Sequence, residues 1–169
     1  MYMLVFIHIG SRRVWVSSPT AHPDSRWVAQ QARNVCMEFA EEEHKPTYVM
    51  HDADTKFTRQ FDEIFKAEGI KTKKHLPASP NLNAFVERWI QSVQQECLDH
   101  FVVLGERHFN HIVREYVDFY NDFRPHEGRD HLPPAMTNPP PEAQTVRLDD
   151  VVCRQRLGGL LKHYERQAA

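Results

Sequence analysis

Strand-like and helix-like runs alternate along the first half of this chain, and this alternation restricts the possible folds more than any other feature. The strand-like runs are short and apolar or alternating, whereas the helix-like runs repeat apolar residues every three to four positions. Strands that alternate with helices predict an α/β layer architecture. The expected strands are residues 3–9, 13–17, 47–50 and 70–76, and the expected helices are residues 25–43 and 58–68.

Turn and cap signals delimit these elements. Gly10-Ser11-Arg12 predicts the turn of an antiparallel hairpin between the first two strands. Asp24 is the expected N-cap of the first helix, and Gly69 is the expected C-cap of the second. The strand at residues 47–50 is expected to be buried. The strand at residues 70–76 carries lysines, which is typical of an edge strand protected by charge.

The second half of the chain is expected to be helical. A polar loop at residues 77–83 precedes two long helices, at residues 84–101 and 106–123. Prolines interrupt residues 133–141, so a helix cannot continue through them. The expected division is residues 1–132 for a core and residues 133–169 for a Pro-rich linker with a short tail.

The composition is that of a soluble globular protein, with 41% hydrophobic and 26% charged residues in 169. Since the apolar runs are far shorter than a membrane span needs, no membrane partner is expected. Cys36, Cys97 and Cys153 form no CxxC pair and indicate reduced thiols, so we expect a cytoplasmic protein. A net charge of -2 neither favours nor excludes nucleic acid, because a local basic surface can coexist with a neutral total.

Two carboxylates stand where a metal site would need them. Asp52 directly follows the strand at residues 47–50, and ligands of α/β sheets gather at the carboxyl ends of strands. Glu87 lies at the opening of the next long helix. Converging carboxylates suit two-metal phosphoryl chemistry. A structural interpretation stays open. In it, Asp52 or Asp54 begins a turn and caps a helix, and Glu87 is favoured near the start of its helix by the positive end of the helix dipole.

Both acids lie in motifs that recur together in one family. The first motif is His51-Asp52-Ala53-Asp54-Thr55-Lys56-Phe57-Thr58, and the second runs from Ser79-Pro80-Asn81 to Glu87-Arg88-Trp89. In this order and spacing the chain resembles the retroviral-integrase-like (DDE) catalytic core of bacterial insertion-sequence transposases over nearly its full length. Further segments similar to this family are residues 96–99, 116–121, 124–126 and 156–161.

The resemblance implies an RNase H-like fold, with a mixed sheet flanked by helices. It also implies an Asp-Asp-Glu triad that binds two Mg²⁺ or Mn²⁺ ions and catalyses DNA cleavage and strand transfer. Asp52 is then the second acid of the triad and Glu87 the third, with Asp54 as a supporting or turn residue. The implied partners are transposon ends and target DNA in the bacterial nucleoid, and either further copies of the chain or an intact transposase.

Two departures from the family pattern affect this interpretation. The family's first acid lies on an initial central strand, whereas the first acidic residue here is Asp24. We therefore expect this strand to be missing and the chain to be inactive in strand transfer. Gln94 stands where the family usually places a basic residue that faces DNA. Three hypotheses stay open: a recombinase that completes its triad, a non-catalytic DNA-binding or dimerising remnant, and a misassigned start.

The remaining candidates are residues for contact with DNA. The lysines of residues 70–76 can bind phosphates, although a solvated edge strand is the commoner explanation for such lysines. Arg88, which follows Glu87, can reach DNA or pair with an acid nearby. The segment at residues 124–126 can cap the helix that it follows. The predicted DNA-contacting residues are Lys73, Lys74, Arg88, Gln94 and Arg124.

Overall fold

The computed structural model describes residues 1–42, 45–74, 80–139 and 147–166, with the backbone alone for residues 80–83. By its internal contacts the chain divides into two units. Unit 1 comprises Met1–His8 and Trp15–Trp89, and unit 2 comprises Ile9–Val14 and Ile90–Ala169. The division predicted after residue 132 stays a prediction.

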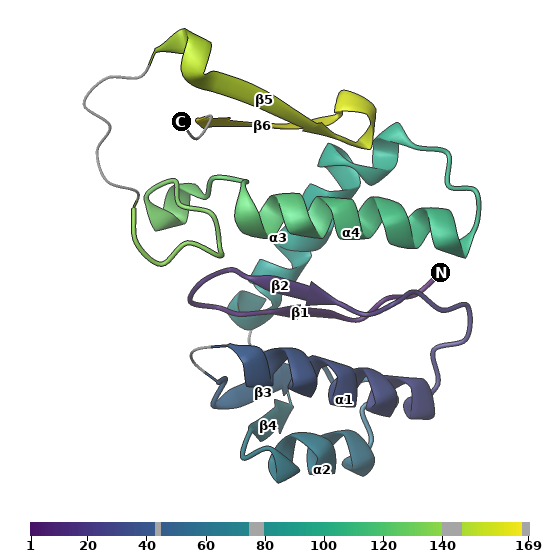
Figure 1. Cartoon of the computed structure of the whole chain (residues 1–169). Helices are drawn as coiled ribbons and strands as arrows, with labels where there is room; N and C mark the ends of the chain where they lie inside the picture. The colour runs from purple at the N-terminus through teal and green to yellow at the C-terminus, as the bar shows by residue number, and fades with distance from the viewer. Residues whose placement is uncertain (43–44, 75–79, 140–146, 167–169) are drawn as a thin grey trace. The chain divides into compact units, whose positions relative to one another are not determined.

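The N-terminal elements alternate as predicted (Figure 1). Their cap signals are also confirmed. The side chain of Asp24 accepts a hydrogen bond from the N–H of Trp27 at 2.7 Å, which satisfies one of the free donors at the start of α1. The elements are β1 (Val5–Ile7), β2 (Val14–Val16), α1 (Ser25–Glu41), β3 (Tyr48–His51), α2 (Arg59–Ala67) and β4 (Lys71–Lys74).

Helix α2 ends in a Schellman motif. Gly69 follows the C-cap with φ +76°, a conformation that glycine adopts at little cost. Its N–H donates to the carbonyl of Lys66, and the N–H of Ile70 donates to the carbonyl of Phe65. Ile70 is buried and leads directly into β4. The glycine therefore turns the chain from the helix into the strand.

The described strands form three separate pairs: β1 with β2, β3 with β4, and β5 with β6. An antiparallel bridge between Tyr2 and Thr20 accompanies the first pair, as the predicted hairpin requires. Strands β3 and β4 run parallel, with Tyr48 opposite Lys71 and His51 opposite Lys74. The expected burial of β3 is wrong, because its residues alternate between exposed and buried. A single RNase H-like sheet and its missing central strand stay predictions.

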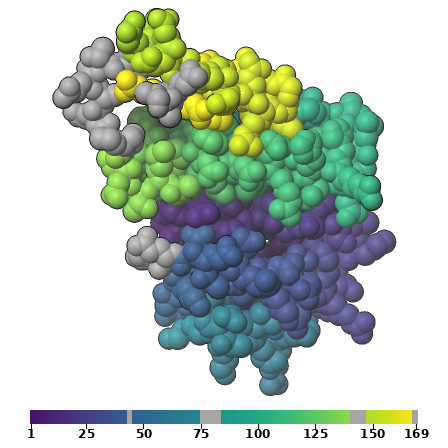
Figure 2. Space-filling model, in the orientation of Figure 1, coloured from purple at the N-terminus to yellow at the C-terminus, as the bar shows by residue number. Residues whose placement is uncertain are grey.

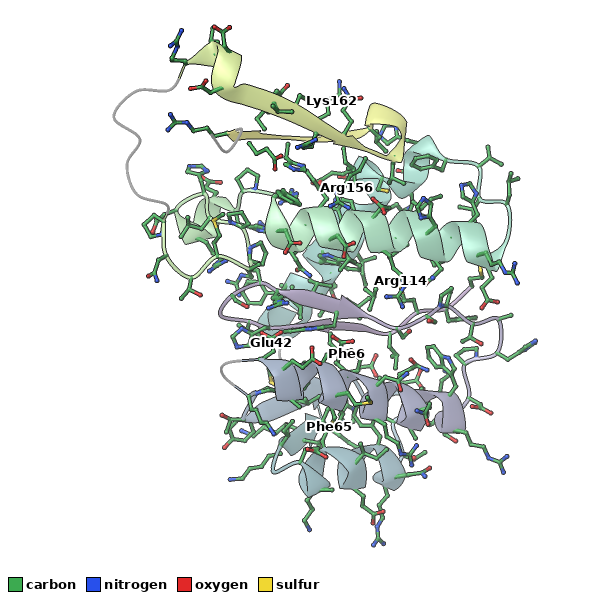
Figure 3. The ribbon with its side chains drawn as sticks, viewed as in Figure 1. Phe6, Glu42, Phe65, Arg114, Arg156 and Lys162 are labelled. Carbon is green, nitrogen blue, oxygen red and sulfur yellow. The ribbon has the colours of Figure 1, made fainter. Side chains whose placement is uncertain are left out.

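The core of unit 1 forms between α1, α2 and the two strands β3 and β4. Phe65 is fully buried and packs against Phe61, with ring centroids 4.9 Å apart. Phe6 from β1 reaches the same core and contacts both Phe65 and Phe39 (Figure 3). Each buried phenylalanine contributes roughly 1.5–3 kcal/mol. The buried core residues are Val28, Ala32, Val35, Cys36, Phe39, Val49, Phe61, Phe65 and Ile70.

Helix α3 (Pro80–Glu96) differs from its predicted bounds at both ends. It begins at Pro80, within the expected loop, because proline suits the first helical position, where no N–H is needed. It stops at Glu96, and a short 3-10 helix, Leu98–His100, replaces the predicted last turn. The rest of the expected loop, residues 77–79, and the end of the strand before it, residues 75–76, lie outside the described residues.

Helix α4 (Glu106–Asp122) confirms the second long helix of the prediction. Its buried positions recur every three to four residues, as an amphipathic helix requires. Tyr116 and Ile112 are fully buried, and Val113 is 2% exposed. The buried face of α4 consists of Ile112, Val113, Tyr116, Val117, Tyr120 and Asn121.

The expectation of a helical C-terminal half is wrong after α4. Strands β5 (Val151–Arg156) and β6 (Leu161–Arg166) form an antiparallel hairpin (Figure 1). One side of the hairpin packs on α4: the ring of His163 stacks on Phe123 with centroids 3.6 Å apart, and Arg156 binds Glu115 at 3.0 Å. In Figure 2 the yellow atoms of the hairpin adjoin the green atoms of α4. Charged residues in both strands interrupt the apolar pattern that predicts a strand, so this hairpin was not predicted from the sequence.

Among the residues that the structure describes, no helix combines the length and the apolar character needed to cross a lipid bilayer.

Candidate functional site

Asp52 lies just beyond the end of β3, exposed, in a segment of successive turns. Its Oδ1 accepts the N–H of Asp54 at 3.0 Å, and Oδ1 of Asp54 accepts the N–H of Lys56 at 2.8 Å. These bonds confirm the turn-forming part of the structural interpretation. The helix-capping part is wrong, because the N-cap of α2 is Thr58.

Asp54 is a turn residue, which is one of the two roles that the sequence predicted for it. The backbone N–H of Lys56 and then its ammonium group lower the pKa of the Asp54 carboxyl. The ammonium also forms an ion pair with Asp54 at 3.0 Å. With Asp54 committed to Lys56, Asp52 is the carboxylate of this turn that keeps an oxygen, Oδ2, outside the turn's hydrogen bonds.

His51 anchors the backbone of Asp52, a role that the sequence prediction missed. Its Nδ1 lies 2.7 Å from the carbonyl oxygen of Asp52, and because a carbonyl only accepts, Nδ1 carries the proton and donates. The side chain is 4% exposed, and its ring packs on Phe57 and Phe61. Its Nε2 faces a carboxylate oxygen of Asp62 at 3.5 Å. A histidine at a strand end, directly before an acid, was the available signal.

Glu87 occupies an exposed position on α3, in unit 1 together with Asp52. Trp89 on the same helix is 3% exposed and provides the buried contact, so Glu87 belongs to the solvent side of α3. Gln94 lies two turns further along α3 and is also exposed. Positions seven apart share one face of a helix, so both residues project from the same side.

The predicted DNA-contacting residues fall into two groups. Lys73, Lys74, Arg88 and Gln94 are exposed. Arg124 is different, because its guanidinium binds both carboxylate oxygens of Glu96, with Nε 2.9 Å from Oε2. Only 26% of the Arg124 side chain is accessible. The structure therefore places Arg124 in an internal ion pair of unit 2.

The Glu96–Arg124 pair is part of a larger network. Tyr116 donates its hydroxyl to Oε2 of Glu96 at 2.9 Å. Burial, with the Glu96 charge beside it, raises the pKa of Tyr116 far above its usual value, so the hydroxyl stays protonated. The hydrogen bonds that Arg124 donates to Glu96 raise the pKa of Arg124, so the guanidinium stays charged. One carboxylate thus satisfies donors on α4 and on the segment that follows it.

Two neighbours in the family-like segments also have internal partners. The amide of Asn121 accepts the N–H of Val14 at 2.9 Å and donates to its carbonyl at 2.8 Å, as an adjacent strand would. The ring of His126 packs edge-on against Tyr120 with centroids 4.6 Å apart. Burial lowers the pKa of His126 to about 4, so the ring is neutral at physiological pH. These residues hold unit 2 together.

Residues 68–134 match the integrase core domain. The matching stretch contains β4, α3 and α4, and with them Glu87, Glu96 and Arg124, but it begins after Asp52. No curated protein matches the sequence of this chain.

Integrase-like architecture extends beyond this stretch. Over 96% of its length, the chain is similar to a chain in the cryo-EM structure described as simian T-cell lymphotropic virus intasome in complex with PP2A regulatory subunit B56 gamma. The TM-score is 0.63 at 13% sequence identity, so the likeness concerns the fold. This chain covers 59% of the matched chain. The comparison confirms the coarse prediction of an integrase-like α/β fold.

The integrase resemblance implies divalent metal, and the described residues fit such a site incompletely. Asp52 and Glu87 supply the carboxylate oxygens that Mg²⁺ prefers. However, the described residues contain no group of three or more His, Cys, Asp or Glu side chains that could hold a metal ion. Two carboxylates can hold one ion weakly, but they do not complete a two-metal site.

Proposed function

We propose that this chain is the core part of a DNA-integrating recombinase of the bacterial insertion-sequence type. The observation that carries the proposal is the match of residues 68–134 to the integrase core domain, a stretch that includes Glu87. The fold likeness to a chain of a retroviral intasome structure supports it over the rest of the sequence. The proposed partners are transposon ends and target DNA, together with further copies of the chain or an intact transposase.

In this proposal Asp52 and Glu87 act as the second and third acids and bind Mg²⁺ or Mn²⁺. His51 is a positioning residue, since its hydrogen bond to the carbonyl of Asp52 orients the turn that presents the carboxylate. The exposed residues Lys73, Arg88 and Gln94 are proposed to contact DNA. Lys74 and Arg124 are left out of this proposal, because Lys74 lies opposite the buried His51 in the strand register and Arg124 is engaged with Glu96.

We further propose that the 169-residue chain by itself performs no strand transfer. The absence of a group of three metal-binding side chains among the described residues favours this second candidate function, a DNA-binding or dimerising protein without catalysis. Such a protein would occupy transposon ends, or pair with an intact transposase, and thereby inhibit it.

The test is a strand-transfer assay with the purified chain, Mg²⁺ or Mn²⁺ and labelled terminal-repeat DNA, run beside a binding assay on the same DNA. We expect DNA binding without nicking or joining. Nicking that disappears in Asp52→Ala and Glu87→Ala, but not in Glu63→Ala, would show that the chain is an active enzyme. Glu63 is the matched control because it is an exposed acid that pairs with Arg59. Failure to bind any DNA would contradict the recombinase and the DNA-binding form of the second candidate, and would leave only a protein that pairs with an intact transposase.

A further inference from the structure

The outer face of β3 and β4 combines an aromatic ring with two lysines. In the parallel register Tyr48 lies opposite Lys71, and Met50 lies opposite Lys73. Paired residues project to the same side of a sheet, and successive residues alternate. Tyr48 is 45% exposed and both lysines are exposed, whereas Val49 and His51 on the other side are buried. We call Tyr48, Met50, Lys71 and Lys73 the basic face.

The ammonium groups of Lys71 and Lys73 both form cation–π contacts with the ring of Tyr48. The Nζ of Lys73 lies 4.3 Å from the ring centroid of Tyr48, and the Nζ of Lys71 lies 5.7 Å from it. Cation–π contacts of this kind keep a lysine near the ring and restrict its freedom. Two cations gathered at one ring also repel each other, because like charges at short range disfavour one another. An anion bound between them would relieve this repulsion.

The charge of the basic face is not neutralised within the described part of the chain, where neither Lys71 nor Lys73 forms an ion pair with a carboxylate. Basic residues of the neighbouring segment differ in this respect. Lys56 pairs with Asp54 at 3.0 Å, and Arg59 pairs with Glu63 at 2.7 Å. The positive charge of the basic face is therefore available to an external anion.

We propose that the basic face binds the phosphodiester backbone of DNA and leads it toward Asp52. The proposal rests on the proposed function and adds to it the surface that receives the DNA. Lysines two positions apart on a strand are separated by roughly 7 Å, so each can meet a different phosphate. Affinity would come from counterion release, which needs cations rather than apolar area.

The direction of the strands connects this face to the candidate site. Lys71 and Lys73 follow each other along β4, which runs parallel to β3, and Lys73 lies opposite Met50, two residues before Asp52. A backbone held by both lysines therefore lies on the approach to the end of β3, where Asp52 begins its turn. The face offers Met50 and Tyr48 as its only half-exposed apolar contacts, which suits a polyanion better than a second protein copy.

The register also separates lysines that the sequence grouped together. Lys74 lies opposite His51, whose side chain is buried on the other side of the sheet. Lys71, and not Lys74, is accordingly the partner of Lys73 on the basic face. Lys74 provides a control with the same charge, on the same strand, one residue away.

The test measures binding of a short fluorescein-labelled DNA duplex by anisotropy at several salt concentrations. In Lys71→Ala/Lys73→Ala we expect weaker binding and a salt dependence whose logarithmic slope falls by roughly 2, since each phosphate that a lysine neutralises adds about 0.9 to the slope. Lys74→Ala should bind as the wild type does. Circular dichroism and urea midpoints verify that each variant is folded.

The support from the ring is tested separately. Tyr48→Phe keeps the aromatic face and should bind DNA normally, whereas Tyr48→Leu should weaken binding by roughly two- to fivefold. If Tyr48→Phe weakens binding as much as Tyr48→Leu, the ring does not position the lysines.

The outcomes distinguish this inference from the proposed function. Wild-type protein that binds no DNA would overturn the proposed function. If DNA binding is unchanged in Lys71→Ala/Lys73→Ala, the proposal that the basic face binds DNA is wrong, while the proposed function stands. An equal loss of DNA affinity in Lys74→Ala would have the same meaning. Vesicles rich in phosphatidylserine test the other polyanionic surface: binding to them that is lost in the double variant, with DNA binding intact, would also overturn the proposal for the basic face.

Discussion

At the scale of single residues, the carboxylate of Glu96 connects several elements of unit 2. It accepts hydrogen bonds from Tyr116 on α4 and from Arg124 just beyond the helix. A charged group that loses its partner in a partly buried place keeps its desolvation cost and gains nothing in return. The arginine is therefore stable in this position only while Glu96 is ionised.

Glu96→Gln should lower the free energy of unfolding by about 1–2 kcal/mol, less than for a fully buried pair, because both side chains retain some exposure. Urea denaturation followed by circular dichroism measures the change. Glu63→Gln is the matched control, because it breaks an exposed ion pair with Arg59 and should cost less than about 0.5 kcal/mol. Equal losses in the two variants would contradict the role assigned to Glu96.

His126 makes the stability of the chain depend on pH. Burial lowers its pKa in the folded state from 6.5 to about 4. Between these values the unfolded chain binds a proton that the folded chain does not, so stability falls as the pH decreases from about 6.5 to about 4. In His126→Gln this part of the pH dependence should disappear from urea titrations. His100→Gln, at an exposed position, should leave it in place.

At the scale of elements, local signals decide where helices begin and end. Asp24 and Gly69 act within their own turns, so their roles follow from the sequence alone. Pro80 begins α3 by an equally local rule, but the sequence prediction did not apply this rule and placed a loop through residue 83. The hairpin β5–β6 is of another kind, since it packs on α4 through Arg156 (Figure 3) and His163.

Gly69→Ala should lower the free energy of unfolding by about 1 kcal/mol, because φ is +76° there and alanine rarely adopts it. Steric clash is not the cause, since an added Cβ would meet no atom within 4 Å. Gly128→Ala is the control: its added Cβ also meets nothing within 4 Å, and its φ is not in the positive range. It should be neutral or slightly stabilising. Thermal or urea unfolding that ranks the two variants equally would refute the explanation.

At the scale of the whole molecule, we expect Asp52 and Glu87 to share one metal ion. They come from different elements of unit 1, a turn after β3 and helix α3. If both bind one ion, removing the second carboxylate should cost less after the first is gone, so the two effects are not additive.

A double-mutant cycle on Mn²⁺ affinity tests this sharing. We expect weak binding by the wild type in calorimetric titration, weaker binding by Asp52→Asn and by Glu87→Gln, and little further loss in the double variant. Asp62→Asn is a control acid of the same unit, which faces His51 instead. Additive losses of Mn²⁺ affinity would mean that the two acids form independent weak sites. Two tight sites in the wild type would contradict the conclusion that these residues form an incomplete metal site.

Sequence reasoning reached the α/β class and the N-terminal order of elements, because amphipathic periods and caps depend on near neighbours. The resemblance of the motifs around Asp52 and Glu87 to a known family added the integrase-like fold. It did not find the hairpin β5–β6, whose strands carry four Lys or Arg residues and become stable by packing on α4. It also could not choose between capping and DNA contact for Arg124, since the deciding partner, Glu96, lies 28 residues away.

By itself, the sequence determined the alternation of strands and helices, the helix caps at Asp24 and Gly69, and the two acids, Asp52 and Glu87, as candidates. These conclusions rest on residue types and short spacings. Only the tertiary structure decided that Arg124 neutralises Glu96, and that Lys71 and Lys73 both lie over the ring of Tyr48. The physical reason is that such pairings arise from strand register and burial between segments far apart in the chain, which short spacings do not encode.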